Sequence, residues 1–266
     1  MSILEEILAH KSEEVSEQRK KVSESSLAKS LYFDRTIVSM KAHLQRHDKV
    51  GIISEIKRSS PSEGLINGGI DVKQLSTGYV DAGATGLSVL SDYKYFGGTL
   101  EDVITARKHN NCPILRKEFI VDEYQLLEAK SAGADCILLI AAALPEKRCK
   151  ELADFAKKIG LEILLEVHNK SEIESHLSDS VDIVGVNNRN LHNFTTSIQN
   201  SIDLAEFIPD QFVKISESGI TKAEHIIELK KYGFKGFLIG THFMNHTKPN
   251  EACARLIDEV KTLEKK

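Results

Sequence analysis

Acidic, basic and amide side chains stand at the ends of several short apolar runs in this 266-residue chain. The first run ends in Glu55 and Lys57, and later runs end in Lys117, Glu166 and Asn187. Residues two apart on a strand point to the same side, so Glu55 and Lys57 would share one face. A carboxylate beside an ammonium can transfer protons, but it can also be a structural ion pair at a strand end. This first run alone leaves both interpretations open.

The elements that must position these side chains begin after residue 49. Short apolar runs there alternate with segments of helical spacing, which predicts parallel βαβ units. Eight such units indicate an α/β fold of the (β/α)8 TIM-barrel type, whose active sites lie at the C-terminal ends of the strands. An open doubly wound sheet is the alternative, and it is disfavoured because no GxGxxG follows the first run. The predicted strands are 50–56, 86–90, 114–116, 136–140, 162–167, 183–186, 212–215 and 236–239.

Helical patterns occupy the rest of the chain. In the barrel they predict helices at 72–82, 100–109, 123–132, 146–159 and 222–232, and before the barrel at 2–21, 26–32 and 36–47. The first 49 residues are too few and too polar to hold a core alone. We therefore predict an N-terminal helical extension, 1–49, packed on a barrel catalytic domain, 50–266.

Composition excludes several classes of function. The chain has 35 Lys and Arg against 39 Asp and Glu, a formal net charge of −4, which gives no electrostatic case for nucleic acid or an anionic membrane. Its four cysteines show neither CxxC spacing nor a metal-type cluster. The acidic start lacks signal-peptide order, and the longest apolar run is far below the roughly 20 residues of a membrane span. We expect a soluble, cytoplasmic protein without a metal site.

Small residues end the last two predicted strands, at Ser218-Gly219 and Gly240-Thr241. Glycine lets a backbone approach a ligand closely, and N–H groups near helix N-termini stabilise anions. TIM barrels commonly bind phosphate here, so a phosphorylated substrate is predicted, although tight turns alone would use the same residues.

The lysines and the glutamate allow two chemistries. A lysine at a barrel mouth can act as a general acid, or it can form a Schiff base as in an aldolase. A glutamate at the end of an apolar strand can have a raised pKa. His168 and His242 also fall near the predicted mouth, where each is expected to be a supporting or solvent-exposed residue rather than a ligand.

Read together, the strand-end motifs resemble the indole-3-glycerol phosphate synthase family of tryptophan biosynthesis. The resemblance covers nearly the whole chain, including the helical extension, and it depends on the joint order of the motifs. They are SEIKRSSPSEG (54–64), YFGGTLEDV (95–103), LRKEFIVDEYQ (115–125), AGADCILLIAAAL (132–144), LLEVHN (164–169), VGVNNRNL (184–191), ISESGI (215–220) and FLIGTHFM (237–244).

The resemblance implies ring closure of 1-(2-carboxyphenylamino)-1-deoxyribulose 5-phosphate, with loss of carbon dioxide and water and without metal or organic cofactor. By motif, Lys117 resembles the general acid of ring closure and Glu166 the acid/base or electrostatic partner near the anilino nitrogen. Lys57 resembles the cation that meets the substrate carboxylate and acts in dehydration, a step that Glu55 and Asn187 assist. The division of labour between the two lysines stays open. Substrate-binding residues implied in the same way are Arg189, Ser218, Gly219, Gly240 and Thr241 for phosphate, Ser60 in a mobile loop, and Phe96, Phe119, Leu138 and Leu191 around the aromatic ring.

Some positions depart from the family pattern. Glu118 and Asn190 stand where aspartate is usual, Thr99 replaces serine, and Thr241-His242-Phe243 is unusual beside the last strand. Only the last departure touches the predicted phosphate end. Two alternatives remain: another sugar-phosphate barrel enzyme, such as a Schiff-base aldolase or phosphoribosyl isomerase, and a catalytically silent barrel that binds another enzyme of the pathway.

Overall fold

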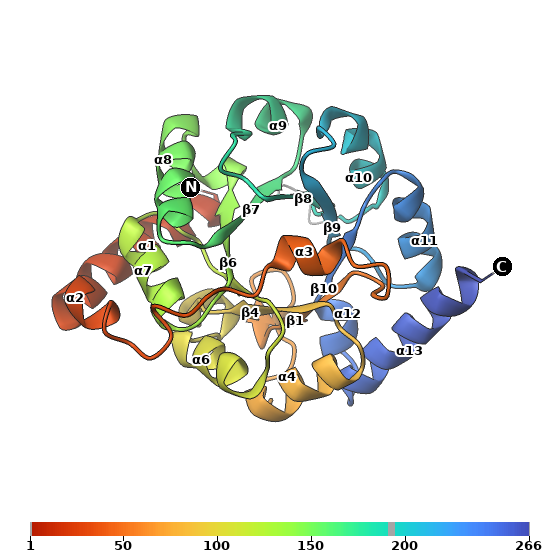
Figure 1. Cartoon of the computed structure of the whole chain (residues 1–266), viewed down its shortest axis with the longest axis horizontal. Coiled ribbons are helices and arrows are strands. Elements are labelled where there is room, and N and C mark those ends of the chain that lie inside the picture. Colours follow the sequence, from red (N-terminus) through yellow and green to blue (C-terminus); the bar gives the residue numbers. More distant parts are fainter. Residues whose placement is uncertain (1, 191–194, 266) are drawn as a thin grey trace.

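The computed structural model describes residues 2–190 and 195–265. Within these ranges eight parallel strands close into a barrel in the order β1-β10-β9-β8-β7-β6-β5-β4, with helices around it (Figure 1). The predicted TIM barrel is therefore confirmed. The strands are β1 (Ile52–Ile56), β4 (Gly86–Leu90), β5 (Ile114–Lys117), β6 (Cys136–Ile140), β7 (Glu162–Val167), β8 (Ile183–Asn187), β9 (Val213–Glu217) and β10 (Gly236–Ile239).

The outer ring includes the five helices predicted in the barrel, α4, α6, α7, α8 and α11, and each of their ends lies within one residue of the prediction. Its members are α4 (Val72–Asp81), α6 (Leu100–His109), α7 (Glu123–Ser131), α8 (Glu146–Lys158), α9 (Lys170–His176), α10 (Gln199–Leu204), α11 (Ala223–Lys231) and α13 (Pro249–Leu263). Short elements lie in the connections between strands and helices: β2 (Ser59–Ser60), β3 (Gly64–Leu65), α5 (Tyr93–Phe96), η1 (Ala141–Ala143), η2 (Ala205–Phe207) and α12 (Thr241–Met244). No helix of the described residues is long and apolar enough to cross a membrane.

The strands are apolar on both faces because each one is covered on both sides. Outward residues such as Ile52 pack with the helices in the larger core cluster. Inward residues such as Ile53 and Leu115 fill the barrel interior in a second cluster. Both faces of a strand are thus committed to a core, which explains why the strands read as nearly continuous apolar runs.

Polarity changes along the barrel axis. With a side-chain period of two, the residues that follow inward-facing Ile53, Leu115 and Leu164 on the same face are Glu55, Lys117 and Glu166. The barrel interior is therefore apolar toward the N-terminal ends of the strands and charged at the mouth, where the strands have their C-terminal ends. This alternation, which is local to each strand, carries the chemical groups to one end of the barrel.

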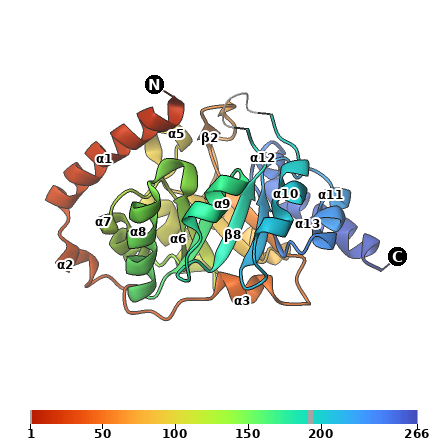
Figure 2. The same ribbon diagram turned by 90° about the horizontal axis from the view of Figure 1, so that it is seen from above.

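The opposite end is closed by α3 (Met40–Leu44). Met40 and Leu44 belong to the interior cluster, and Gly86 and Gly236 leave the space they need: a Cβ at Gly86 would lie 2.7 Å from the Met40 sulfur. Figure 2 shows α3 on the side of the barrel away from α1 (Ile3–Lys21). The segment before the barrel thus contacts both ends of it.

Two of the predicted N-terminal helices are shorter than expected. The pattern at 26–32 gives α2 at Glu24–Leu27, and the pattern at 36–47 gives only α3. The reason is tertiary: Val38 N–H donates to the Asp135 carboxylate, and Ser39 caps α3 by accepting from Ala42 N–H. The chain before Ser39 is held extended along the barrel instead of continuing the helix.

Helix α1 starts with a capping box between Ser2 and Glu5 and ends in basic residues, as the helix dipole favours. It contacts the barrel through a buried ammonium: Lys11 is only 1% exposed. Its Nζ lies 2.9 Å from Asp92 Oδ2 and 3.1 Å from Glu118 Oε1, two residues that follow β4 and β5. This cluster fixes α1 beside the mouth.

Candidate active site

The charged mouth opens into a cavity of about 540 Å³. Every predicted site residue that the structure describes lines it, and Leu191 lies outside the described residues. The predicted residues at the cavity are Glu55, Lys57, Ser60, Phe96, Lys117, Phe119, Leu138, Glu166, Asn187, Arg189, Ser218, Gly219, Gly240 and Thr241.

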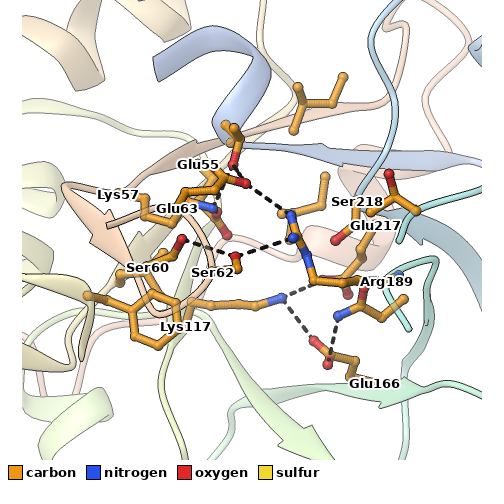
Figure 3. Close-up of a pocket in the computed structure, with 18 of the residues that line it drawn as sticks. Glu55, Lys57, Ser60, Ser62, Glu63, Lys117, Glu166, Arg189, Glu217 and Ser218 are labelled. Atoms are coloured by element: carbon orange, nitrogen blue, oxygen red, sulfur yellow. Dashed lines mark hydrogen bonds and ion pairs between the residues drawn. The ribbon is translucent and has the colours of Figure 1, made fainter. Parts of the chain in front are cut away.

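Lys117 is the centre of the charged mouth (Figure 3). Its Nζ donates to Glu166 Oε2 at 3.1 Å and also to the carboxylate of Glu217. Glu166 in turn accepts from Asn187 Nδ2 at 3.1 Å. Four strands, β5, β7, β8 and β9, therefore contribute to one network.

The pKa values of this network follow from its charges. Burial alone lowers the pKa of Lys117, but the carboxylates of Glu217, Glu166 and Glu55 outweigh burial and raise it above its ordinary value. Burial raises the pKa of Glu217 to about 7, with Lys117 opposing and Glu166 adding to the rise. For Glu166, burial is opposed by Lys117 and His168, which hold its pKa below the ordinary value. The network thus contains a charged ammonium and a carboxyl that titrates near neutrality.

Glu217 ends β9 within the ISESGI motif, and sequence analysis assigned it no role. Its place at the end of β9 was the signal that could have identified it. Room for its carboxylate comes from Gly185 on the neighbouring strand, where a Cβ would lie 2.3 Å from Glu217 Oε1. This oxygen is buried and has no hydrogen-bond partner among the described residues.

The pair Glu55 and Lys57 lies on the same side of the strand, as predicted. Lys57 Nζ is 3.4 Å from Glu55 Oε1 and donates to Thr241 Oγ1 at 3.0 Å. A Cβ at Gly240 would lie 2.3 Å from Glu55 Oε1, so the glycine makes room for that carboxylate. The pair is therefore both an ion pair and part of the cavity wall.

The loop after β1 reaches across the mouth to Arg189. The guanidinium donates to Ser62 Oγ at 3.2 Å and to Glu63 Oε1 at 3.1 Å (Figure 3). Thr241 Oγ1 donates to the same Glu63 oxygen at 3.3 Å. Sequence analysis did not anticipate Glu63. A carboxylate from the chain itself thus contacts two of the groups predicted to hold a phosphate.

The backbone beside Arg189 is shaped for a close approach. Ser218 and Gly219 both have positive φ, 67° and 75°, and Ser218 is the non-glycine residue with that property in the described chain. A side chain at Gly219 would meet Thr196 at 3.0 Å. Successive backbone N–H groups in a turn of this kind can bind an anion.

The remaining wall of the cavity is apolar. The rings of Phe96 and Phe119 lie 6.0 Å apart between centroids, and Leu138 continues this surface. Helix α1 adds Ile3, Leu4 and Ile7, which sequence analysis did not assign to the site because they are far from the barrel in sequence. Among the described residues no group of three His, Cys, Asp or Glu side chains could hold a metal ion.

Comparisons with known proteins agree with this geometry. A family model described as indole-3-glycerol phosphate synthase matches residues 4–256. A protein of that name from Bacteroides thetaiotaomicron is 44% identical, covering 97% of this chain and 98% of that protein. Namesakes from Bordetella pertussis and Laribacter hongkongensis are 36% and 38% identical, each covering 96% of this chain and 98% of its own length.

Among solved structures, a mutant tryptophan synthase alpha-subunit from the hyperthermophile Pyrococcus furiosus has a similar fold. Its TM-score is 0.60 at 17% identity, covering 80% of this chain and 98% of that chain. At this identity the likeness concerns the fold alone.

Proposed function

The chain belongs to the indole-3-glycerol phosphate synthase family, and we propose that its charged mouth closes the indole ring with Lys117 as the general acid. The enzyme is a carboxy-lyase of tryptophan biosynthesis. It converts 1-(2-carboxyphenylamino)-1-deoxyribulose 5-phosphate into indole-3-glycerol phosphate, carbon dioxide and water. The roles below are assigned from the geometry of the cavity.

Ring closure forms a carbon–carbon bond between the carboxylate-bearing ring carbon and the ketone carbon. Negative charge develops on the ketone oxygen, and a positioned ammonium stabilises it and supplies the proton. Lys117 suits this step because its neighbouring carboxylates raise its pKa and keep it charged. The single observation that supports the assignment best is the contact of its Nζ with both Glu166 and Glu217 inside the cavity.

Loss of carbon dioxide returns the bonding electrons to the ring, and loss of water then completes the indole. Glu166, held ionised and oriented by Asn187, is proposed to stabilise positive charge at the anilino nitrogen. Lys57 is proposed to bind the substrate carboxylate and then to protonate the departing hydroxyl, with Glu55 orienting it at 3.4 Å.

The two ends of the substrate take the two remaining surfaces. Phosphate is proposed to bind Arg189 and the left-handed backbone at Ser218-Gly219. Completing the proposed substrate-binding set are Gly240, Thr241 and, in the loop after β1, Ser60, with Phe96, Phe119, Leu138 and Leu191 around the aromatic ring. An apolar wall around the ring favours loss of the carboxylate charge.

A Schiff-base aldolase would need a neutral lysine as the nucleophile. The raised pKa of Lys117 disfavours that alternative. Borohydride in the presence of substrate should therefore leave Lys117 unmodified.

We also propose that this protein works in the cytoplasm, alongside other enzymes of tryptophan biosynthesis.

The deciding experiment is turnover of the carboxyphenylamino-deoxyribulose phosphate by wild type and Lys117→Ala, followed by indole fluorescence. The chain has no tryptophan, so the protein background is low. Removing the proton donor should reduce kcat about 10²- to 10⁴-fold. Full activity of a folded Lys117→Ala variant would reject the role of Lys117, and binding without turnover by wild type would support a silent barrel.

A further inference from the structure

A histidine that the proposed mechanism does not use lies next to Glu166. His168 is two residues beyond Glu166 and directly follows β7, and both side chains line the same cavity. Its side chain is 10% exposed and lines the cavity. The residue therefore belongs to the mouth, in contact with a group proposed for catalysis.

The imidazole lies between two carboxylates. His168 Nε2 is 3.7 Å from Glu166 Oε1, and Nδ1 is 3.5 Å from Glu172 Oε2 on α9. Both ring nitrogens are buried, and neither has a hydrogen-bond partner among the described residues. A neutral imidazole would turn a lone pair toward one carboxylate, whereas the imidazolium presents an N–H to each of them. The geometry therefore fits the charged ring.

Glu172 is held in place independently of the ring. Its Oε2 accepts from His168 N–H at 2.7 Å, and its Oε1 accepts from Asn169 Nδ2 at 2.7 Å. Because both oxygens are engaged, the carboxylate stays at the outer side of the imidazole. In space, the positively charged imidazole of His168 thus lies between the carboxylates of Glu166 and Glu172.

The charges that face the ring agree in sign. Burial lowers the pKa of His168, but contact with Glu172 on α9, together with Glu166 on β7 and Glu217 on β9, outweighs burial and raises it. Reciprocally, His168 and Lys117 hold the pKa of Glu166 below its ordinary value despite burial. Lys117, from β5, is the other cation on Glu166.

We propose that His168 is a positioning residue: as an imidazolium between Glu166 and Glu172, it keeps the Glu166 carboxylate ionised while Lys117 gives up its proton. When Lys117 protonates the ketone oxygen, it becomes neutral, and Glu166 loses that cationic partner. His168 then remains as the positive charge beside Glu166. This inference goes one step beyond the proposed function and rests on the assigned role of Glu166.

The first test is the pH profile of kcat/KM for His168→Gln. Without the imidazolium, the decline of kcat/KM on the acidic side of the profile should shift to higher pH by about 0.5 to 1 pH unit. At a fixed acidic pH, this shift corresponds to about threefold to tenfold lower kcat/KM. Near pH 8 the variant should lose less activity than it does at acid pH, because Glu166 is ionised there in the free enzyme of both proteins. Glu172→Gln keeps the histidine and removes only the outer carboxylate. The acidic side of its pH profile should therefore shift in the same direction as that of His168→Gln, by a smaller amount.

The second test observes the ring directly, without turnover. An NMR titration that follows the imidazole signals of the ten histidines, with His168 assigned by its loss in His168→Gln, measures the pH at which His168 is half protonated. This midpoint should lie above the ordinary histidine value of about 6.5. The midpoint should fall in Glu172→Gln and in Glu166→Gln, since coupling between two sites is reciprocal. A pH profile whose acidic side does not shift in a folded His168→Gln protein would overturn the proposal, and so would a His168 midpoint below about 6.5.

These measurements separate the inference from the proposed function. If Glu166→Gln keeps full activity, the role of Glu166 fails and the catalytic part of the inference fails with it. If Glu166→Gln is inactive while His168→Gln has the wild-type pH profile, only the role of His168 is rejected.

Discussion

Lys117 Nζ and Glu166 Oε2 lie 3.1 Å apart although they come from strands β5 and β7, which are separated by β6. The contact runs across the barrel interior rather than along the sheet. It brings a proton donor and a carboxylate together above an apolar interior, where electrostatic interactions are stronger than in water. The predictions below test the consequences of that placement.

Replacing Glu217 by glutamine should stabilise the protein at high pH. The pKa of Glu217 is raised from 4.5 to about 7 in the folded state, so ionising it opposes folding, and stability is lost as pH rises toward and through 7. Glu217→Gln avoids this cost, and its free energy of unfolding should exceed that of wild type at pH 8 by on the order of 2 kcal/mol. Urea unfolding at pH 8 and pH 5 measures the difference, which should be smaller at pH 5.

The exposed Glu13 is the matched control for that experiment. Glu13→Gln should leave the pH dependence of unfolding as in wild type. A Glu217→Gln protein that is less stable than wild type at pH 8 would contradict the prediction and would mean that the contact with Lys117 outweighs burial.

Replacing Glu63 by glutamine should improve substrate binding. Its carboxylate holds Arg189 at 3.1 Å and accepts from Thr241, so a phosphate proposed to bind there must displace it. With both groups about one quarter exposed, we expect KM to fall about twofold to fivefold, the range of a partly exposed ion pair. Steady-state kinetics and inhibition by inorganic phosphate measure the effect.

Ser62→Ala is the control, because Ser62 also contacts Arg189 but carries no charge. Its KM should change less than that of Glu63→Gln. A higher KM in Glu63→Gln would indicate that Glu63 holds the loop in a binding-competent position rather than competing with the phosphate.

Removing the buried ammonium of α1 should destabilise the protein strongly. Lys11→Met leaves Asp92 and Glu118 buried without their shared cation, which should cost about 3–5 kcal/mol. Glu14→Gln removes only the partner that is 42% exposed and should cost less than about 1 kcal/mol. Thermal unfolding of both variants decides the prediction, and equal losses would reject it.

Adding a methyl group at Gly185 should displace the Glu217 carboxylate and so alter the Lys117 network. A Cβ there would lie 2.3 Å from Glu217 Oε1, so Gly185→Ala must move the carboxylate that contacts Lys117. We expect a loss of about 1–3 kcal/mol in stability and a lower kcat. Gly69→Ala is the control, since nothing lies within 4 Å of a Cβ there, and it should change neither quantity.

The sequence by itself determined the barrel and most of its mouth. Strand and helix periodicities are local, and a period of two places Glu55 with Lys57 on one face. A parallel barrel then brings all strand ends to one opening, so residues as distant as Lys57 and Thr241 could be predicted to share a site before any contact was known.

Tertiary structure decided how these groups contact one another. The start of α3 depends on Asp135, a residue far along the chain, and periodicity does not encode that contact. The contact of Glu63 with Arg189 joins two loops. The contacts of Lys11 with Asp92 and Glu118 join the N-terminal helix α1 to the barrel beside the mouth. Burial sets the charge of Glu217, because the pKa of a carboxyl group depends on the three-dimensional arrangement of neighbours rather than on its place in the sequence.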